Sequence, residues 1–162
     1  MSGLYFDTPV ILLDIDGSSK EEVLRMMAQN LVSNELVKQS FVEAVVQREN
    51  EYATGLPTGD IAVAIPHTDV EHVQRKAISV GILRDPVDFI VMGDDKETVP
   101  VKIVFMLAMD EAHSQLKLLQ QLMQVFQDQN VLKELSSTSD KKQIKKMMEE
   151  KLEALSFKGG ER

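Results

Sequence analysis

The segment from Ile61 to His67 constrains the fold of this chain more than any other segment. Ile61–Ile65 is a short apolar run bounded by glycine and proline, which is typical of a buried β-strand. Pro66 has no amide hydrogen to donate to a neighbouring strand, so we expect the chain to leave the sheet there. His67 is therefore predicted to lie just beyond a strand end, where open α/β sheets usually bind their ligands.

Strand and helix patterns alternate along the remaining sequence. Further strands are predicted at Val10–Ile15, Ala77–Leu83 and Val101–Ala108. Helices are predicted after Ser18 or Ser19, from Phe41 to around Arg48–Asn50, from His113 onward and at Met147–Leu155. The spacer between the last two strands is predicted to be a loop, with Asp85–Pro86 and the polar stretch 93–98. Because this spacer shows no helical pattern, we expect a mixed sheet in a layered α/β architecture.

The length and composition are those of one globular domain. A chain of 162 residues with 43% apolar and 27% charged residues fits a single domain over 1–162, with a frayed tail at 158–162. Asp14 and Asp16 interrupt the apolar run near the start, so it is not a signal peptide, and no run approaches the roughly 18 residues of a membrane span. The sequence has no cysteines, which excludes disulfides and a cysteine nucleophile. We expect a cytoplasmic protein.

The charge distribution argues against nucleic-acid binding. The net charge is −8, whereas a surface that binds the phosphate backbone needs clustered Lys and Arg. The only basic run, Lys141–Lys146, is interleaved with Glu149, Glu150 and Glu153, so we interpret it as a solvated helix face. Tryptophan is absent and only 2 Tyr and 6 Phe are present, which leaves little for stacking on bases.

Three histidines are candidates for reactive or metal-binding groups: His67, His72 and His113. Their spacing matches no recognised zinc pattern, and the sequence has no glycine-rich nucleotide motif and no nucleophile elbow, so we expect neither metal nor cofactor. From the residues alone, His67 is either a hydrogen-bonded structural imidazole or a reactive one, and His72 is predicted to lie on the surface. Arg48 is either a surface residue or a guanidinium fork for phosphate oxygens.

Two linked motifs carry a resemblance to a known family. Residues 48–55 read R-E-x(4)-T-G, residues 59–67 read G-x-I-A-x-A-I-P-H, and a helix of the form L-x-x-L-x-x-L follows at Leu116–Leu122. This combination, over roughly residues 8–155, resembles the enzyme IIA domains of the phosphoenolpyruvate-dependent sugar phosphotransferase system. The fructose/mannitol class, which includes galactitol-type and nitrogen-regulatory members, is the most similar branch.

The resemblance implies a three-layer α/β/α sandwich around a mixed sheet, and a phosphoryl-carrier function. It implies that His67 accepts a phosphoryl group from the carrier protein HPr, on Nε2 (a tele-phosphohistidine). His67 then passes the group to a cysteine of a IIB domain while the IIC permease transports the sugar, and Arg48 stabilises the phosphoryl oxygens. Such a protein meets the membrane only through the permease complex. The alternative is a regulatory IIA-like module in which the phosphorylation state of His67 controls partner binding.

The sequence departs from the family pattern at two positions. Members of the fructose and mannitol types usually have a second active-site histidine directly before the L-x-x-L-x-x-L helix. Here Gln115 holds that position and His113 lies two residues earlier, so the second donor is His113 or Gln115. Ala53 also replaces the usual proline before Thr-Gly, and both changes make the chain more similar to the galactitol type than to the mannitol type.

Overall fold

A computed structural model describes residues 3–158 of the chain, with side chains up to residue 153. Five strands form one sheet in the order β1-β4-β5-β3-β2. The strands are β1 (Ile11–Ile15), β2 (Gly55–Leu56), β3 (Ala62–Ala64), β4 (Ala77–Ile90) and β5 (Thr98–Ala108). The helices are α1 (Lys20–Ser33), α2 (Ser40–Glu51), α3 (Ala112–Val125), α4 (Gln129–Ser137) and α5 (Lys141–Lys158), with short 3-10 turns η1 (Thr8–Val10) and η2 (Val70–His72).

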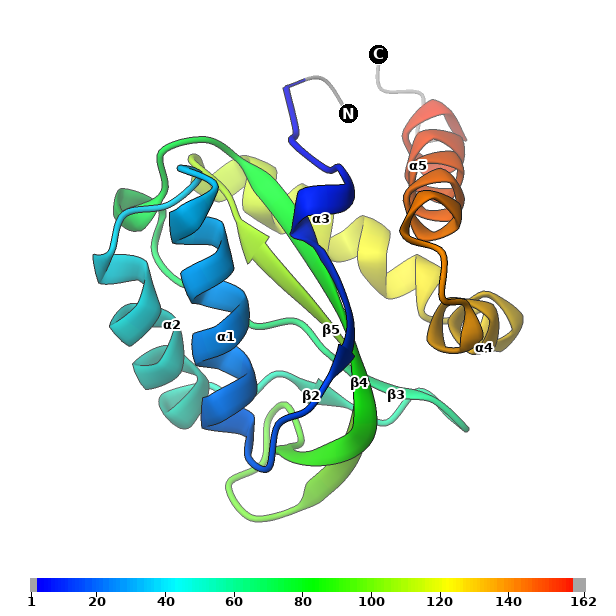
Figure 1. Cartoon of the computed structure of the whole chain (residues 1–162), viewed down its shortest axis with the longest axis horizontal. Helices are drawn as coiled ribbons and strands as arrows, with labels where there is room; N and C mark the ends of the chain where they lie inside the picture. The colour runs from blue at the N-terminus through cyan, green and yellow to red at the C-terminus, as the bar shows by residue number, and fades with distance from the viewer. Residues whose placement is uncertain (1–2, 159–162) are drawn as a thin grey trace.

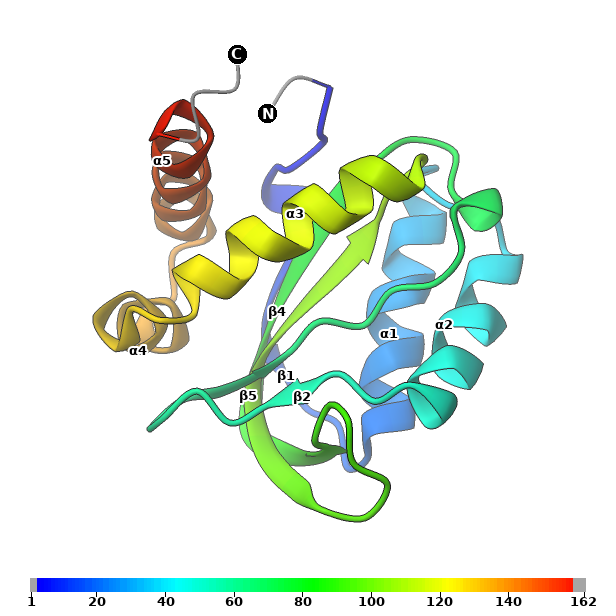
Figure 2. The same cartoon turned by 180° about the vertical axis from the view of Figure 1, so that it is seen from behind.

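Helices cover both faces of the sheet, which confirms the predicted three-layer α/β/α sandwich. Figures 1 and 2 show α1 and α2 on one face and α3, α4 and α5 on the other. The first helix begins where predicted, because the Ser19 hydroxyl accepts a hydrogen bond from the Glu22 amide at 3.2 Å. Met27 and Leu31 are then fully buried on the same helix, which contacts β4.

The sheet is mixed, as predicted, because β4 and β5 form a long antiparallel pair with no crossover helix between them. Two parallel pairs, β1 with β4 and β3 with β5, flank this hairpin, and β2 is antiparallel to β3. Contact with β5 continues beyond the last residue of β3, where the Leu107 amide donates to the Pro66 carbonyl at 3.0 Å. This bond holds the chain against the sheet up to the residue before His67.

The predicted loop at Asp85–Pro86 is wrong, because β4 continues through this dipeptide to Ile90. The register with β5 shifts between Ile82 and Val87, so the proline lies in an irregular part of the ladder. A missing amide hydrogen is tolerated at such a bulge. The connection between the two strands is therefore shorter than predicted.

Three other elements differ from the sequence-based expectation. The strand β2 has only two residues, which is too short for a periodic pattern. The helix α4 begins after Asp128, whose carboxylate accepts hydrogen bonds from the amides of Asn130 and Val131. The helix α5 begins at Lys141, well before Met147.

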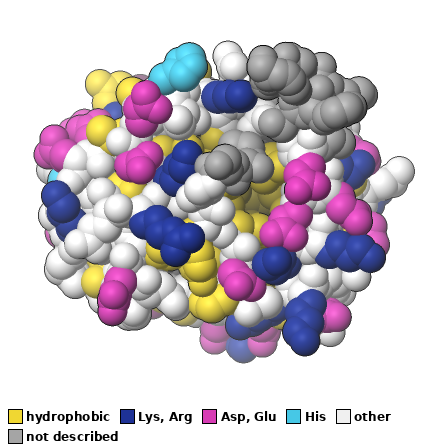
Figure 3. Space-filling view, turned by 90° about the horizontal axis from the view of Figure 1, so that it is seen from above, with side chains coloured by type: hydrophobic (Ala, Val, Ile, Leu, Met, Phe, Trp, Pro, Cys, Tyr) yellow, Lys and Arg dark blue, Asp and Glu magenta, His cyan; other side chains and the backbone are white. Residues whose placement is uncertain are grey.

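The basic run of α5 lies among acidic side chains. Lys145 pairs with Glu149 at 3.0 Å, and Lys151 pairs with Asp128 at 3.7 Å. Figure 3 shows acidic and basic side chains intermingled on one face of the molecule. Two lysines of this helix, one of them in the basic run, therefore have acidic partners nearby.

Two further expectations concern the chain ends and the membrane. Of the tail predicted to fray at 158–162, residues 159–162 lie outside the described residues. Within the described part of the chain, no helix combines the length and the apolar character that crossing a membrane requires.

Candidate functional site

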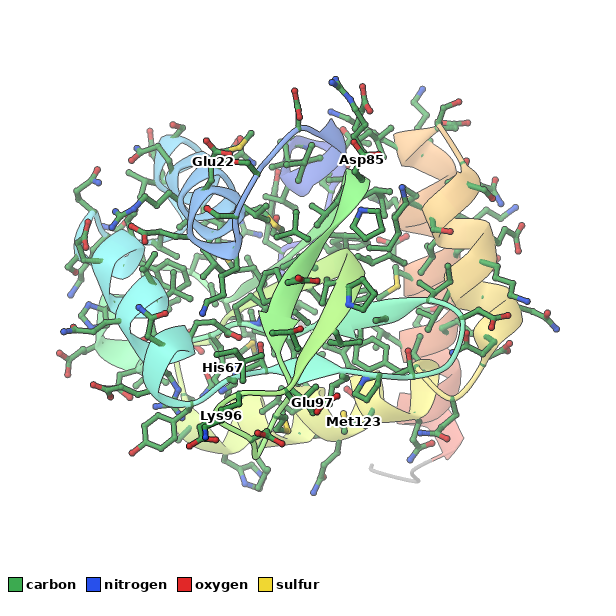
Figure 4. All side chains as sticks on the ribbon, turned by 90° about the horizontal axis from the view of Figure 1, so that it is seen from below. Glu22, His67, Asp85, Lys96, Glu97 and Met123 are labelled. Atoms are coloured by element: carbon green, nitrogen blue, oxygen red, sulfur yellow. The ribbon has the colours of Figure 1, made fainter. Side chains whose placement is uncertain are left out.

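His67 follows the carboxyl end of β3, as predicted from the Pro-His step. Figure 4 shows its side chain beside α2. The last turn of α2 carries Arg48, and the chain then turns back through β2, which pairs with β3. Arg48 is close enough to act electrostatically on His67. The structure thus brings together the two residues that the sequence singled out.

The His67 ring is half-buried and held in one tautomer by the backbone. Its Nδ1 lies 2.8 Å from the carbonyl oxygen of Ile65. A carbonyl oxygen can only accept a hydrogen bond, so Nδ1 carries the proton. In the neutral ring the lone pair therefore lies on Nε2.

The surroundings of His67 favour the neutral ring. Burial is the main cause that lowers the pKa of His67 below its usual value near 6.5, and the positive charge of Arg48 lowers it further. The hydrogen bond to Ile65 acts in the opposite direction but is outweighed. The imidazole is therefore neutral, and nucleophilic at Nε2, at neutral pH.

Arg48 is half-exposed and only loosely paired. Its guanidinium lies over the ring of Tyr52, 4.9 Å from the ring centroid, which holds the side chain by a cation–π contact. The nearest carboxylate oxygen recorded for it belongs to Asp69, at 4.0 Å, the outer limit of an ion pair. A guanidinium in this setting can turn its donors toward an arriving anion.

Glu49, the neighbour of Arg48, points the other way, into the protein. It is 2% exposed, and its two carboxylate oxygens accept hydrogen bonds from the amide and the hydroxyl of Thr54, both at 2.8 Å. The Thr54 oxygen in turn accepts from the Ile65 amide at 3.2 Å. Sequence reasoning assigned no role to Glu49 or Thr54, although both belong to the R-E-x(4)-T-G motif that could have indicated one.

Two glycines shape the return of the chain toward β3. A side chain at Gly55 would bring a Cβ to 2.7 Å from the Ile90 carbonyl oxygen, so only glycine allows β2 to approach that backbone. Gly59 adopts a φ of +119°, a conformation that side-chain-bearing residues rarely adopt. Gly55 lies in β2, and Gly59 lies in the bend that leads into β3.

The two alternatives for a second donor lie in different environments on α3. His113 is exposed in the first turn of the helix. Gln115 is half-buried, and its side-chain oxygen is buried with no hydrogen-bond partner among the described residues. The unpartnered atom is an acceptor, so any bond from Gln115 to an anion would have to come from its amide nitrogen.

His72 is less exposed than predicted. Its side chain is 19% exposed, its Nδ1 lies 2.9 Å from the Ser40 hydroxyl, and its Nε2 lies 3.7 Å from a carboxylate oxygen of Glu71. These contacts tie η2 to the start of α2, so His72 is a structural histidine.

The site can perform nucleophilic chemistry on an anionic group. Among the described residues, no three His, Asp or Glu side chains gather closely enough to hold a metal ion. What the structure does provide is a neutral imidazole with a free lone pair on Nε2 and, in the last turn of α2, a guanidinium whose positive charge acts on that ring. Phosphoryl transfer requires little more than such positioning and charge stabilisation.

Comparisons with known proteins agree with this chemistry. The family model described as "Phosphoenolpyruvate-dependent sugar phosphotransferase system, EIIA 2" matches residues 4–151. The multiphosphoryl transfer protein of Shigella flexneri is 31% identical over 146 residues, and the match covers 88% of this chain but only 17% of that protein. The galactitol-specific EIIA component of the phosphotransferase system of Escherichia coli K12 is 27% identical over 135 residues, with 83% of this chain and 86% of the relative covered.

A solved structure supports the fold. The complex of enzyme IIAMTL and phosphorylated enzyme IIBMTL from Escherichia coli contains a chain that superposes with a TM-score of 0.72 at 21% identity. The superposition covers 93% of this chain and 99% of that one.

Proposed function

This chain belongs to the EIIA 2 family of the phosphoenolpyruvate-dependent sugar phosphotransferase system, and we propose that it carries the phosphoryl group on Nε2 of His67. It is a phosphotransferase component, so a nucleophile that can hold phosphorus reversibly is required. The observation that carries the proposal is the bond from Nδ1 to the Ile65 carbonyl, which leaves Nε2 as the free nucleophile.

In the proposed reaction, the Nε2 lone pair of His67 attacks the phosphorus of phosphohistidine on HPr. The new N–P bond forms as the old one breaks, and the electron pair of the old bond returns to the imidazole of HPr. The Ile65 carbonyl stabilises the positive charge that develops on the His67 ring, because it accepts a hydrogen bond from Nδ1–H. Arg48 stabilises the equatorial phosphoryl oxygens.

In the second step we propose that a cysteine thiolate of a IIB domain attacks the same phosphorus, and the N–P electron pair returns to Nε2 of His67. The relative from the mannitol system was solved together with phosphorylated IIB, which supports a IIB partner here. A IIC permease would complete the system, and the chain would act on the cytoplasmic side of the membrane. No metal or nucleotide takes part in either step.

For the second donor we propose Gln115 rather than His113. The side chain of Gln115 is half-buried on the first turns of α3, and its amide nitrogen can donate a hydrogen bond to a phosphoryl oxygen. His113 is exposed, so any bond it makes competes with water.

The decisive test is labelling with phosphoenolpyruvate, enzyme I and HPr. Wild-type protein should take up one phosphoryl group, and ³¹P and ¹⁵N NMR should place it on Nε2 of His67. His67→Gln should take up none, whereas the control His72→Gln should be labelled like the wild type. Undiminished labelling of His67→Gln, or a phosphoryl group on Nδ1, would overturn the proposal.

A further inference from the structure

Glu49 is a buried ionisable side chain that the phosphoryl-transfer chemistry does not use. Burial raises the pKa of its carboxyl to about 7, against the effect of the two Thr54 hydrogen bonds and of Lys20. A well-packed apolar side chain would fill the same space at a lower cost in folding free energy, because a buried carboxylate must be desolvated. A position used only for packing does not need an acid.

The contacts of Glu49 lead to the catalytic ring by way of the backbone. Its carboxylate accepts one hydrogen bond from the Thr54 hydroxyl and one from the Thr54 amide, both at 2.8 Å. A hydroxyl has one proton to donate, so this bond leaves the Thr54 oxygen free to accept from the Ile65 amide at 3.2 Å. The carbonyl of the same Ile65 accepts a hydrogen bond from the Nδ1–H of His67 at 2.8 Å.

These bonds fix Ile65 at both of its polar groups. Thr54 holds the amide and His67 contacts the carbonyl, while the next carbonyl, that of Pro66, accepts from Leu107 on β5. The direction of the Ile65 carbonyl decides which ring nitrogen of His67 is protonated. If the Thr54 hydroxyl turned away, the Ile65 amide would lose this bond and the Ile65 carbonyl would be held less firmly.

We propose that Glu49 is a positioning residue that sets the tautomer and orientation of His67 through Thr54 and Ile65. The carboxylate orients the Thr54 hydroxyl, the hydroxyl anchors the Ile65 amide, and the Ile65 carbonyl keeps the proton on Nδ1. The inference rests on the proposed carrier function of His67 for its effect on transfer, but its effect on the tautomer does not depend on that function.

The first readout is the ¹⁵N NMR signature of His67 in the unphosphorylated protein, at a pH above the pKa of the ring and above the Glu49 pKa of about 7. The wild type should show a protonated Nδ1 and an unprotonated Nε2. Glu49→Gln and Thr54→Val should each show a mixture of the two tautomers. Thr54→Ser, which keeps the hydroxyl, should restore the wild-type signature.

The second readout is the rate of phosphorylation by phospho-HPr. Glu49→Gln and Thr54→Val should be slower in kcat by about ten-fold or more, the range typical of residues that orient a reacting group from behind it, with KM for phospho-HPr little changed. Ser79→Ala is the matched control, because Ser79 is also a buried hydroxyl and donates to the Val10 carbonyl at 2.8 Å. That variant should leave both readouts unchanged.

The outcomes separate this inference from the carrier proposal. If Glu49→Gln and Thr54→Val fold and keep both the wild-type tautomer and the wild-type rate, the positioning role is overturned. If Glu49→Gln does not fold, the comparison of Thr54→Val with Thr54→Ser decides alone. If wild-type His67 takes up no phosphoryl group, the carrier proposal fails, and the tautomer signature still supports or overturns the positioning role.

Discussion

Arg84 and Arg48 lie in two surface regions that use a guanidinium in different ways. Arg84 makes a two-point bond with Asp14, at 2.9 and 3.0 Å, and a further contact with Asp16 at 3.1 Å. The guanidinium of Arg48 lies 4.0 Å from the nearest described carboxylate oxygen, which belongs to Asp69. The donors of an arginine that links two strands are directed at carboxylate oxygens of the protein. An arginine that receives an anion keeps its donors available for that anion.

The carboxyl groups of the two regions differ in their exposure and in the direction of their pKa shifts. Asp14 is exposed, and the hydrogen bond from Arg84 lowers its pKa below the usual value. Glu49 lies behind Arg48 and is buried, which raises its pKa to about 7. The region around His67 therefore contains groups whose ionisation is perturbed by burial, which is common at functional sites, and the Arg84 region does not.

The largest effect that we expect from this contrast is on the transfer rate. Arg48→Ala should slow phosphorylation of His67 by about 100-fold or more, because one charged donor to the transferring group is lost. Arg84→Ala should transfer at the wild-type rate, because its partners lie outside the site. Rapid-quench kinetics with phospho-HPr measures both, and equal rates for the two variants would remove Arg48 from the mechanism.

The second expected effect is a pH dependence of the free energy of unfolding, caused by the buried carboxyl of Glu49. The folded protein keeps the Glu49 proton up to about pH 7, whereas the unfolded chain releases it near pH 4.5. This group therefore makes the folded state less stable as the pH rises from about 4.5 to about 7, by on the order of 3 kcal/mol in free energy of unfolding.

Urea unfolding of wild type and Glu49→Gln at pH 5 and pH 8 tests this expectation. The wild type should lose stability relative to the variant as the pH is raised. Asp14 has the opposite sign, because its pKa is lowered, and its contribution is lost only as the pH falls below its usual value of 3.8. Parallel stability curves for the two proteins would show that Glu49 is ionised throughout this range.

A smaller effect is expected from the neutral donor on α3. A single uncharged hydrogen bond contributes about 1 kcal/mol, so Gln115→Ala should slow transfer roughly five-fold. His113→Ala, on the exposed first turn, should transfer at nearly the wild-type rate. The reverse order of the two variants would assign the second donor to His113.

The smallest expected effect is on the titration of His67. Because the charge of Arg48 adds to burial in lowering the pKa of His67, Arg48→Ala should raise that pKa toward the usual value without reaching it. Arg84→Ala should leave it unchanged. An NMR titration of the His67 ring gives both values, and an unchanged pKa in Arg48→Ala would place the guanidinium too far away to act on the ring.

The sequence predicted the fold well where the pattern was local and periodic. The run Ile61–Ile65, the cap at Ser19 and the amphipathic helix after His113 were all placed within a few residues of their observed positions. The errors lie where tertiary contacts overrule local signals. Asp85–Pro86 reads as a turn, but pairing with β5 carries the strand through it.

The two main residues of the proposed site were singled out from the sequence, but the hydrogen bonds that hold them in place were not. Pro66 and His67 mark a strand end in the sequence itself, and Arg48 follows from the resemblance of its motif. The inward direction of Glu49 could not be read, because adjacent residues on a helix face different ways and only the packing of α2 decides which one is buried.

The sequence alone determined that one histidine follows a buried strand in an α/β chain without cysteines, because periodicity and composition are properties of the chain itself. Only the tertiary structure decided the state of that histidine. Its tautomer depends on the Ile65 carbonyl, its pKa on burial and on Arg48, and its restraint on the Thr54 hydroxyl. Each of these properties depends on burial or on contacts that only the folded chain establishes, so no local pattern encodes them.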